Sequence, residues 1–155
     1  MEYIKNGNFI NDLESWQAPD GFEPDFQPHP GGQSIRLPID TLISQTLPDL
    51  PGQILLIEFD VISADPQIKT DFAVSVGGLA ADGTPEASPV PGVANQVWRR
   101  LSVNLYFQNP LINCFINVAT ASPAKKKKKR ALTLGPVRFG NFSLKEVAIL
   151  TRDGS

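Results

Sequence analysis

The chain contains 155 residues, including 14 prolines and 12 glycines, and 19% of its residues are charged. This length suits one domain with its own hydrophobic core, and so many prolines and glycines exclude a mainly helical protein. The chain has a single cysteine, Cys114, and a single histidine, His29. An internal disulfide and a cysteine-based metal cluster are therefore excluded, and little remains for a histidine-centred site.

The net charge of −2 hides a basic run, Lys125–Arg130, which holds six of the 14 basic residues. Without this run the chain has eight basic and 16 acidic residues, a net charge of −8, so it lacks the basic footprint of a nucleic-acid-binding domain. A run of like charges predicts an exposed loop, and we expect it to contact polyanions. No apolar run reaches the roughly 18 residues of a membrane span, and no signal peptide is visible.

Short apolar or alternating segments follow one another along the chain, separated by turns rich in proline and glycine. The first 32 residues predict a short strand at Glu2–Ile4 and then a long loop rich in aromatic residues. The later predicted strands are Ser34–Leu37, Thr41–Leu47, Gln53–Ser63, Asp71–Gly77, Trp98–Gln108, Leu111–Thr120, Ala131–Leu134 and Pro136–Ile149, with a loop at Gly78–Val93. Eight to ten short strands are typical of an all-β sandwich. We expect one domain over residues 1–150 and a tail over residues 151–155.

The two-residue period of a strand predicts which side chains face the core. In the strand at Trp98–Gln108, the core residues are Leu101, Val103, Leu105 and Phe107, and the outward residues are Arg100, Ser102, Asn104 and Tyr106. In the strand at Leu111–Thr120, the core residues are Ile112, Cys114, Ile116 and Val118, and the outward residues are Asn113, Phe115 and Asn117. Each sheet should therefore have one buried and one solvated face.

Four segments in order along the chain resemble a known family. They are Asn6-Gly7-Asn8-Phe9 followed by Trp16, Ile43-Ser44-Gln45 followed by the Pro51-Gly52 turn, Trp98-Arg99-Arg100-Leu101, and the closing run from Val137 to Leu144. In this order they resemble the jelly-roll carbohydrate-binding modules of the galactose-binding-like superfamily. The resemblance covers most of the chain. It implies a jelly-roll β-sandwich of two antiparallel sheets and non-catalytic binding of an oligo- or polysaccharide.

Many modules of that family hold a structural calcium between the N-terminal motif and the closing strand. Two carboxylates of the family pattern are replaced here by Ile10 and Gly140. Calcium needs several hard oxygen ligands, usually including carboxylates. Although Asp12, Glu14 or Asn141 could substitute, we expect this calcium site to be empty or weak, and no other cofactor is predicted.

A bound sugar needs a flat apolar platform with hydrogen-bonding groups beside it. Six outward residues on two successive strands match this need: Arg100, Asn104, Tyr106, Asn113, Phe115 and Asn117. We predict them to be ligand-binding residues, with Tyr106 as the stacking surface. The alternative is a solvated sheet face that carries one covered aromatic ring. The sequence does not show whether Tyr106 and Phe115 share a sheet.

Other aromatic residues are predicted to be structural. Trp16 and Trp98 occupy positions that are core in the family pattern, and a bulge would turn Trp98 inward. The loop Gln17–Gly32 is predicted to plug an open end of the sandwich with its two phenylalanines; the alternative is a binding rim. His29 lies between two prolines and is predicted to be a surface residue.

Three functions remain. The leading hypothesis is a glycan-binding domain, whose weak sites would gain avidity in a homo-oligomer or beside sibling domains. The second is a structural or adhesion module of a larger assembly, which would show a continuous apolar patch. The third is a small hydrolase that uses Glu58 and another carboxylate; Asp60 lies about 7 Å from Glu58 on the same face of a strand, but catalytic pairs usually come from different strands. Alternating acids are routine on a solvated sheet, so we predict that the protein is not an enzyme. Glycan binding usually acts outside the cell, and the sequence leaves the localisation open.

Overall fold

The computed structural model describes residues 1–122 and 133–147, and it contains nine strands in these ranges. The strands are β1 (Asp25–His29), β2 (Gly32–Leu37), β3 (Leu42–Leu47), β4 (Ile54–Ser63), β5 (Thr70–Leu79), β6 (Pro85–Ala94), β7 (Arg99–Tyr106), β8 (Ile112–Thr120) and β9 (Val137–Glu146). The basic run Lys125–Arg130 and the predicted tail lie outside the described residues. The described part contains no helix that could cross a membrane.

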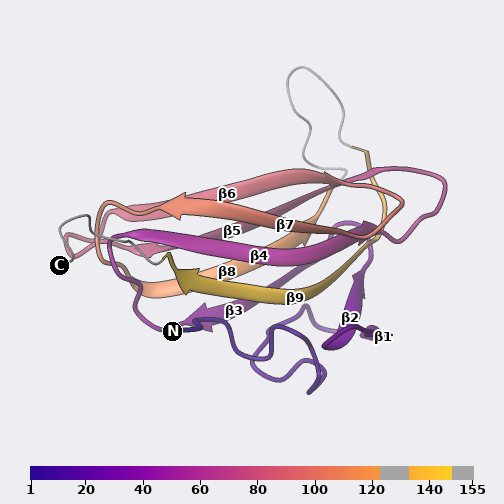
Figure 1. Cartoon of the computed structure of the whole chain (residues 1–155), viewed down its shortest axis with the longest axis horizontal. Coiled ribbons are helices and arrows are strands. Elements are labelled where there is room, and N and C mark those ends of the chain that lie inside the picture. The colour runs from indigo at the N-terminus through magenta and orange to yellow at the C-terminus, as the bar shows by residue number, and fades with distance from the viewer. Residues whose placement is uncertain (123–132, 148–155) are drawn as a thin grey trace, which may run out of the picture.

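The strands form two antiparallel sheets that lie face to face (Figure 1). One sheet has the order β1-β2-β9-β4-β7 and the other the order β3-β8-β5-β6. Strands that are distant in sequence lie side by side, because β9 lies between β2 and β4. The predicted all-β jelly-roll sandwich is therefore confirmed. We call the solvent side of each sheet the five-stranded face and the four-stranded face.

The core lies between the sheets and follows the predicted alternation. In β4 the odd-numbered residues Leu55, Ile57, Phe59 and Val61 are all 0% exposed. Phe59 lies at the centre, with its ring 5.2 Å from that of Phe142 and 5.9 Å from that of Phe72. Cys114 is also buried, as predicted, and burial raises the pKa of its thiol. The alternating pattern thus builds one continuous apolar layer.

Two bulges change the alternation, and both were missed from sequence. The pairing of β9 with β4 shifts register between Glu58 and Asp60, where Asn141 has a φ of 51°. Asparagine tolerates this left-handed conformation better than most residues. The inward positions consequently change from odd to even along β9, and the Asn141 side chain is turned towards the five-stranded face, where it contacts Asp60.

A similar bulge lies in β8 at Asn113, where φ is 51° and the register with β5 shifts. Gly78 permits it, because a Cβ there would lie 2.7 Å from the carbonyl oxygen of Ile112. The bulge corrects one prediction: Ile112 is 47% exposed and does not join the core. The alternating pattern alone cannot reveal a bulge, because one extra residue reverses which side chains face the core in the part of the strand that precedes it.

The segment predicted as a loop at Gly78–Val93 is mostly strand, and this prediction was wrong. Strand β6 pairs with β5 over ten residues although it contains Pro85, Pro89 and Pro91. It is the outermost strand of its sheet, so it has a partner on one side only. Proline lacks an N–H and is tolerated at such an edge, where it also discourages pairing with another chain.

The N-terminal segment closes one side of the sandwich instead of forming a strand. Glu2 makes only an isolated bridge with Lys145 of β9, and Gln17 makes one with Ser44 of β3, so the segment joins both sheets. Its aromatic side chains enter the core, where Trp16 is 7% exposed as predicted. Strand β1 lies within the predicted aromatic loop. The two phenylalanines of that loop pack against the core, in agreement with the predicted plug.

Candidate functional site

The six predicted ligand-binding residues do not share one surface. Strand β7 belongs to the five-stranded sheet and β8 to the four-stranded sheet, so their outward side chains lie on opposite faces of the molecule. Arg100, Asn104 and Tyr106 lie on the five-stranded face, while Phe115 and Asn117 lie on the four-stranded face with the bulge residue Asn113 near the strand end. The two faces are therefore separate candidate sites.

The four-stranded face carries three rows of outward residues across β3, β8 and β5. The rows are Leu42, Ala119 and Ala73, then Ser44, Asn117 and Ser75, then Thr46, Phe115 and Gly77. From Ala119 to Phe115 the stripe is about 14 Å long, at about 3.4 Å per residue. Small side chains form its floor, amide and hydroxyl groups lie in its middle, and a half-buried phenyl ring closes it.

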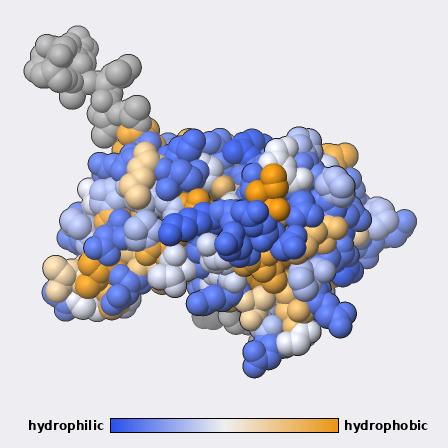
Figure 2. Space-filling model, turned by 90° about the horizontal axis from the view of Figure 1, so that it is seen from below, coloured by the Kyte–Doolittle hydropathy of each residue, from blue (hydrophilic) through white to orange (hydrophobic). Residues whose placement is uncertain are grey.

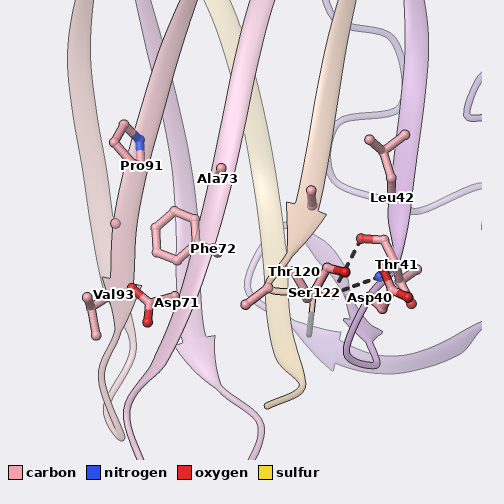
Figure 3. Close-up of a pocket in the computed structure, with 13 residues that line it drawn as sticks. Asp40, Thr41, Leu42, Asp71, Phe72, Ala73, Pro91, Val93, Thr120 and Ser122 are labelled. Atoms are coloured by element: carbon pink, nitrogen blue, oxygen red, sulfur yellow. Dashed lines mark hydrogen bonds between the residues drawn. The ribbon is translucent and has the colours of Figure 1, made fainter. Parts of the chain in front are cut away.

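A hollow of about 460 Å³ lies at the alanine end of this stripe. Leu42 and Pro91 stand on opposite sides of it, with Ala73 between them (Figure 3). Its lining is mostly apolar, and Thr41 and Thr120 supply oxygen atoms at one end, where the backbone N–H of Thr41 donates to the Thr120 hydroxyl over 3.0 Å. Its size lies in the range of small-molecule pockets. The sequence analysis did not predict this hollow, because the β6 residues that line one side of it were predicted to lie in a loop.

The five-stranded face carries a hydrogen-bonded network around the carboxylate of Asp60. Its Oδ2 is 2.8 Å from Nε2 of His29 and 2.9 Å from Nδ2 of Asn141, and its Oδ1 is 3.0 Å from Nη1 of Arg100. Beside it, the Ser102 hydroxyl donates to Glu58 over 2.7 Å. Sequence separations of 31 to 81 residues join these partners, so no local pattern could have predicted the network.

This network does not prepare Asp60 to act as a general acid. Burial by itself would raise the pKa of Asp60, but hydrogen bonds from His29, Asn141 and Arg100 outweigh burial and hold that pKa below its ordinary value. A catalytic general acid needs the opposite shift, since it must keep its proton near neutral pH. Asp60 is therefore ionised at neutral pH, and its contacts join β4 to β1, β7 and β9.

Two predictions about aromatic residues in this region were wrong. Trp98 is 40% exposed and does not enter the core. Its ring lies against His29, with 4.3 Å between the centroids. His29 is not a free surface residue, since its side chain is only 9% exposed. Trp98 lies two residues before the outward Arg100, so the strand period itself indicates an outward position. The bulge that was predicted to turn Trp98 inward does not occur.

Tyr106 and Asn104 point outward as predicted, and Tyr106 is 66% exposed. Arg100, however, lies six residues earlier on the same strand, or about 20 Å away. A single sugar ring could not contact both Arg100 and Tyr106. Arg100 instead pairs with Asp60, while Asn104 remains close enough to Tyr106 to act with it.

The N-terminal turns do not fit a calcium ion. Their carbonyl oxygens already accept hydrogen bonds from side-chain amides: Nδ2 of Asn6 donates to the carbonyls of Asp12 and Glu14, and Nε2 of Gln33 donates to that of Phe9. The described residues contain no group of three or more His, Cys, Asp or Glu side chains that could hold a metal. Side-chain amides of Asn6 and Gln33 thus stabilise these turns by hydrogen bonds.

Chelation should therefore leave the stability of the protein unchanged. We expect the Tm in excess EDTA to lie within about 1 °C of the Tm in excess calcium, because a ligand that binds only the folded state would raise Tm with its concentration. Differential scanning calorimetry with both additives measures this. A fall of many degrees in EDTA would contradict the assignment of amides as the stabilising groups.

The view from below shows the N-terminal side of the molecule (Figure 2). Hydrophilic residues dominate this surface, and hydrophobic residues lie among them in scattered patches (Figure 2). A mixed surface of this kind is usual for a water-exposed protein face. This face shows no continuous apolar patch (Figure 2).

No protein-family model matches the sequence, and neither does any curated protein. Solved structures match the fold closely. A xylan-binding domain from Paenibacillus barcinonensis has a TM-score of 0.64 and 13% identity, over 97% of this chain and 95% of that domain. A family 11 carbohydrate-binding module from Clostridium thermocellum, in complex with a β-1,3-1,4-mixed-linked tetrasaccharide, has a TM-score of 0.60 and 11% identity, over 96% of this chain and 98% of the module.

A third match is the enzymatically active domain of tailspike protein 4 from bacteriophage CBA120, with a TM-score of 0.65 and 13% identity. It covers 94% of this chain, which spans only 21% of that tailspike chain. At such low identities these likenesses show a shared fold. The fold expected from the sequence resemblance, that of jelly-roll carbohydrate-binding modules, is thereby confirmed.

Proposed function

We propose that this protein is a non-catalytic carbohydrate-binding module that holds a glycan on its four-stranded face. The observation that carries the proposal is the stripe from the hollow to Phe115, which combines a small-residue floor, amide and hydroxyl groups, and an aromatic ring. A pyranose presents apolar C–H faces and a rim of hydroxyls, so this combination matches its chemistry. The fold shared with modules described as binding xylan and a mixed-linked tetrasaccharide supports it.

Within the stripe, Asn117 lies between Ser44 and Ser75, so its amide has neighbouring hydroxyls on both sides. An amide can both donate and accept hydrogen bonds, as sugar hydroxyls require. Phe115 lies one outward position further along β8 and supplies the stacking surface. Tyr106 and Asn104, on the opposite face, remain a separate prediction.

The absence of catalysis is part of the proposal. The lowered pKa of Asp60 does not suit a general acid, and the raised thiol pKa of the buried Cys114 does not suit a nucleophile. Incubation with each bound glycan should release no reducing ends. Release of product would assign the protein to the enzymes instead.

The first experiment is a glycan array that includes xylan and mixed-linkage β-glucan, followed by calorimetric titration of each bound glycan. Millimolar to micromolar dissociation constants are expected, because few side chains line the stripe. Binding should not depend on calcium. Failure to bind any glycan on the array would contradict the proposed function.

Phe115→Ala should then weaken glycan binding about tenfold, because one stacked ring contributes about 1.4 kcal/mol. The unfolding free energy should change by only about 1 kcal/mol, since the ring is half-buried on the outer face. Calorimetric titration and urea unfolding measure the two effects. The matched control is Ile10→Ala, a 61% exposed apolar side chain of the N-terminal segment outside the stripe, which should keep wild-type affinity.

A second candidate function is that of a module in a larger assembly, which the likeness to the tailspike domain favours. Such a module would need no sugar site of its own. The two functions differ in one measurement, since the assembly module in isolation would bind no glycan on the array.

A further inference from the structure

We propose that Trp98 forms a second carbohydrate-binding site, on the five-stranded face, which takes the pyranose ring of a glycan against its exposed indole. This inference rests on the proposed function and adds a site to it. The two sites would lie on opposite faces of the sandwich. The protein would then bind two glycan segments at once.

The indole is accessible. Trp98 directly precedes β7 and points outward with Arg100, and it is 40% exposed. The other tryptophan, Trp16, is only 7% exposed and packs against Phe9 and Phe142. Leaving a large aromatic ring in water sacrifices hydrophobic stabilisation, so an exposed indole held in one place indicates a binding surface.

The indole is also held in place from behind. The His29 ring lies 4.3 Å from it, and Nε2 of His29 is fixed by Asp60 over 2.8 Å. Gly140 makes room for this arrangement, because a Cβ there would lie 3.0 Å from the His29 ring. A platform fixed before binding loses less conformational entropy when a ligand arrives. His29 and Asp60 are thus positioning residues for Trp98.

Polar groups for sugar hydroxyls lie beside this platform. The Arg100 side chain is 44% exposed, and it contacts Asp60 and the Asn141 carbonyl through Nη1 and Glu58 through Nε. An open, polar hollow of about 520 Å³ lies next to it, lined by Arg100, Glu58, Asn141 and Ser143. Trp98 does not line this hollow itself, but it stands two residues before Arg100, which does. An indole beside such polar groups fits a pyranose, which stacks through its C–H face and hydrogen-bonds at its edge.

A protein partner is the less fitting occupant. A stable protein interface buries about 800 Å² on each side and has an apolar centre. Around Trp98, however, the side chains of Asp60, Arg100 and Asn141 are polar and bonded to each other. The residue before Trp98, Val97, is apolar and 66% exposed.

The test uses iodide quenching of tryptophan fluorescence, in which the wild-type chain reports on Trp98 because Trp16 is buried. The probes are xylohexaose, the β-1,3-1,4-mixed-linked tetrasaccharide and the best glycan of the array. Saturating probe should reduce the quenching of Trp98 at least twofold. The Phe115→Ala variant should retain this protection, because its intact site lies on the other face.

Two variants in the Phe115→Ala background complete the test. Adding Trp98→Ala should remove the remaining binding, and adding Trp98→Phe should keep part of it. Tyr106→Ala, at the far end of β7 about 27 Å from Trp98, distinguishes this site from the one predicted at Tyr106 and Asn104, and it should keep the remaining binding. Wild-type stoichiometry should be two glycans per chain for short oligosaccharides.

The outcomes separate the two claims. If Phe115→Ala removes all binding and no probe protects Trp98, the second site is overturned while the proposed function stands. If Tyr106→Ala removes the remaining binding and Trp98→Ala does not, the second site is overturned in favour of the Tyr106 and Asn104 prediction. If the wild-type chain binds no glycan, the proposed function fails and the inference fails with it.

Discussion

Replacing Phe59 with alanine is expected to lower the free energy of unfolding by about 4 kcal/mol, which is the largest effect expected of a single substitution here. Phe59 is 0% exposed, and its ring packs against those of Phe72, Phe139 and Phe142 at 5.2 to 6.1 Å. Removing it leaves a cavity between two sheets whose backbones are fixed by their ladders, so the gap cannot close. Tm should fall by about 8–16 °C.

Urea unfolding followed by circular dichroism measures this change. Phe115→Ala is the matched control, because it is the same substitution at an outward position of the sandwich and should cost only about 1 kcal/mol. Glycan affinity should respond in the opposite order: folded Phe59→Ala protein should bind as the wild type does, whereas Phe115→Ala should bind weakly. Equal losses of stability in the two variants would contradict the assignment of inner and outer faces.

Asp60→Ala should cost about 3 kcal/mol at pH 7, because it leaves His29, Arg100 and Asn141 without their shared acceptor. The same carboxylate makes stability depend on pH. Its pKa is lower in the folded state than its ordinary value of 3.8, so its ionised form stabilises the fold above that value. This stabilisation is lost as pH falls from about 4 through the lower pKa of the folded state.

Asp60→Asn isolates the effect of charge, since it keeps the size of the side chain. Its unfolding free energy should fall less than that of the wild type between pH 5 and pH 2, as measured by urea unfolding at each pH. Asp20→Asn makes the same chemical change at an exposed position of the N-terminal segment and should leave the wild-type pH profile intact. A wild-type profile in Asp60→Asn would show that the network does not depend on ionised Asp60.

Asp60 also connects stability to the second glycan site. His29 is held by Asp60 and in turn supports the indole of Trp98, so Asp60→Asn should weaken binding at Trp98 more than binding at Phe115. A purely structural role would weaken both faces alike or neither. Comparing iodide protection of Trp98 with calorimetric affinity therefore separates positioning from general stability.

The sequence by itself determined the fold class, the main strands and the burial of most core residues. Alternation over β4 placed Leu55, Ile57, Phe59 and Val61 inside, and the structure agrees at each of these positions. Such inferences succeed because a strand sets its faces locally, through a period of two that each short segment carries. The outward positions of Tyr106 and Phe115 follow from the same rule.

Only the tertiary structure decided which outward residues meet. Tyr106 and Phe115 lie on opposite faces because β7 and β8 belong to different sheets, and sheet membership depends on pairings between strands far apart in sequence. The network at Asp60 and the hollow on the four-stranded face arise in the same way, from partners that no local pattern connects. The ring of Trp98 is held at the surface by His29 of β1, which packs next to Gly140 and is itself fixed by Asp60 of β4. This arrangement exists only once the sheets have formed.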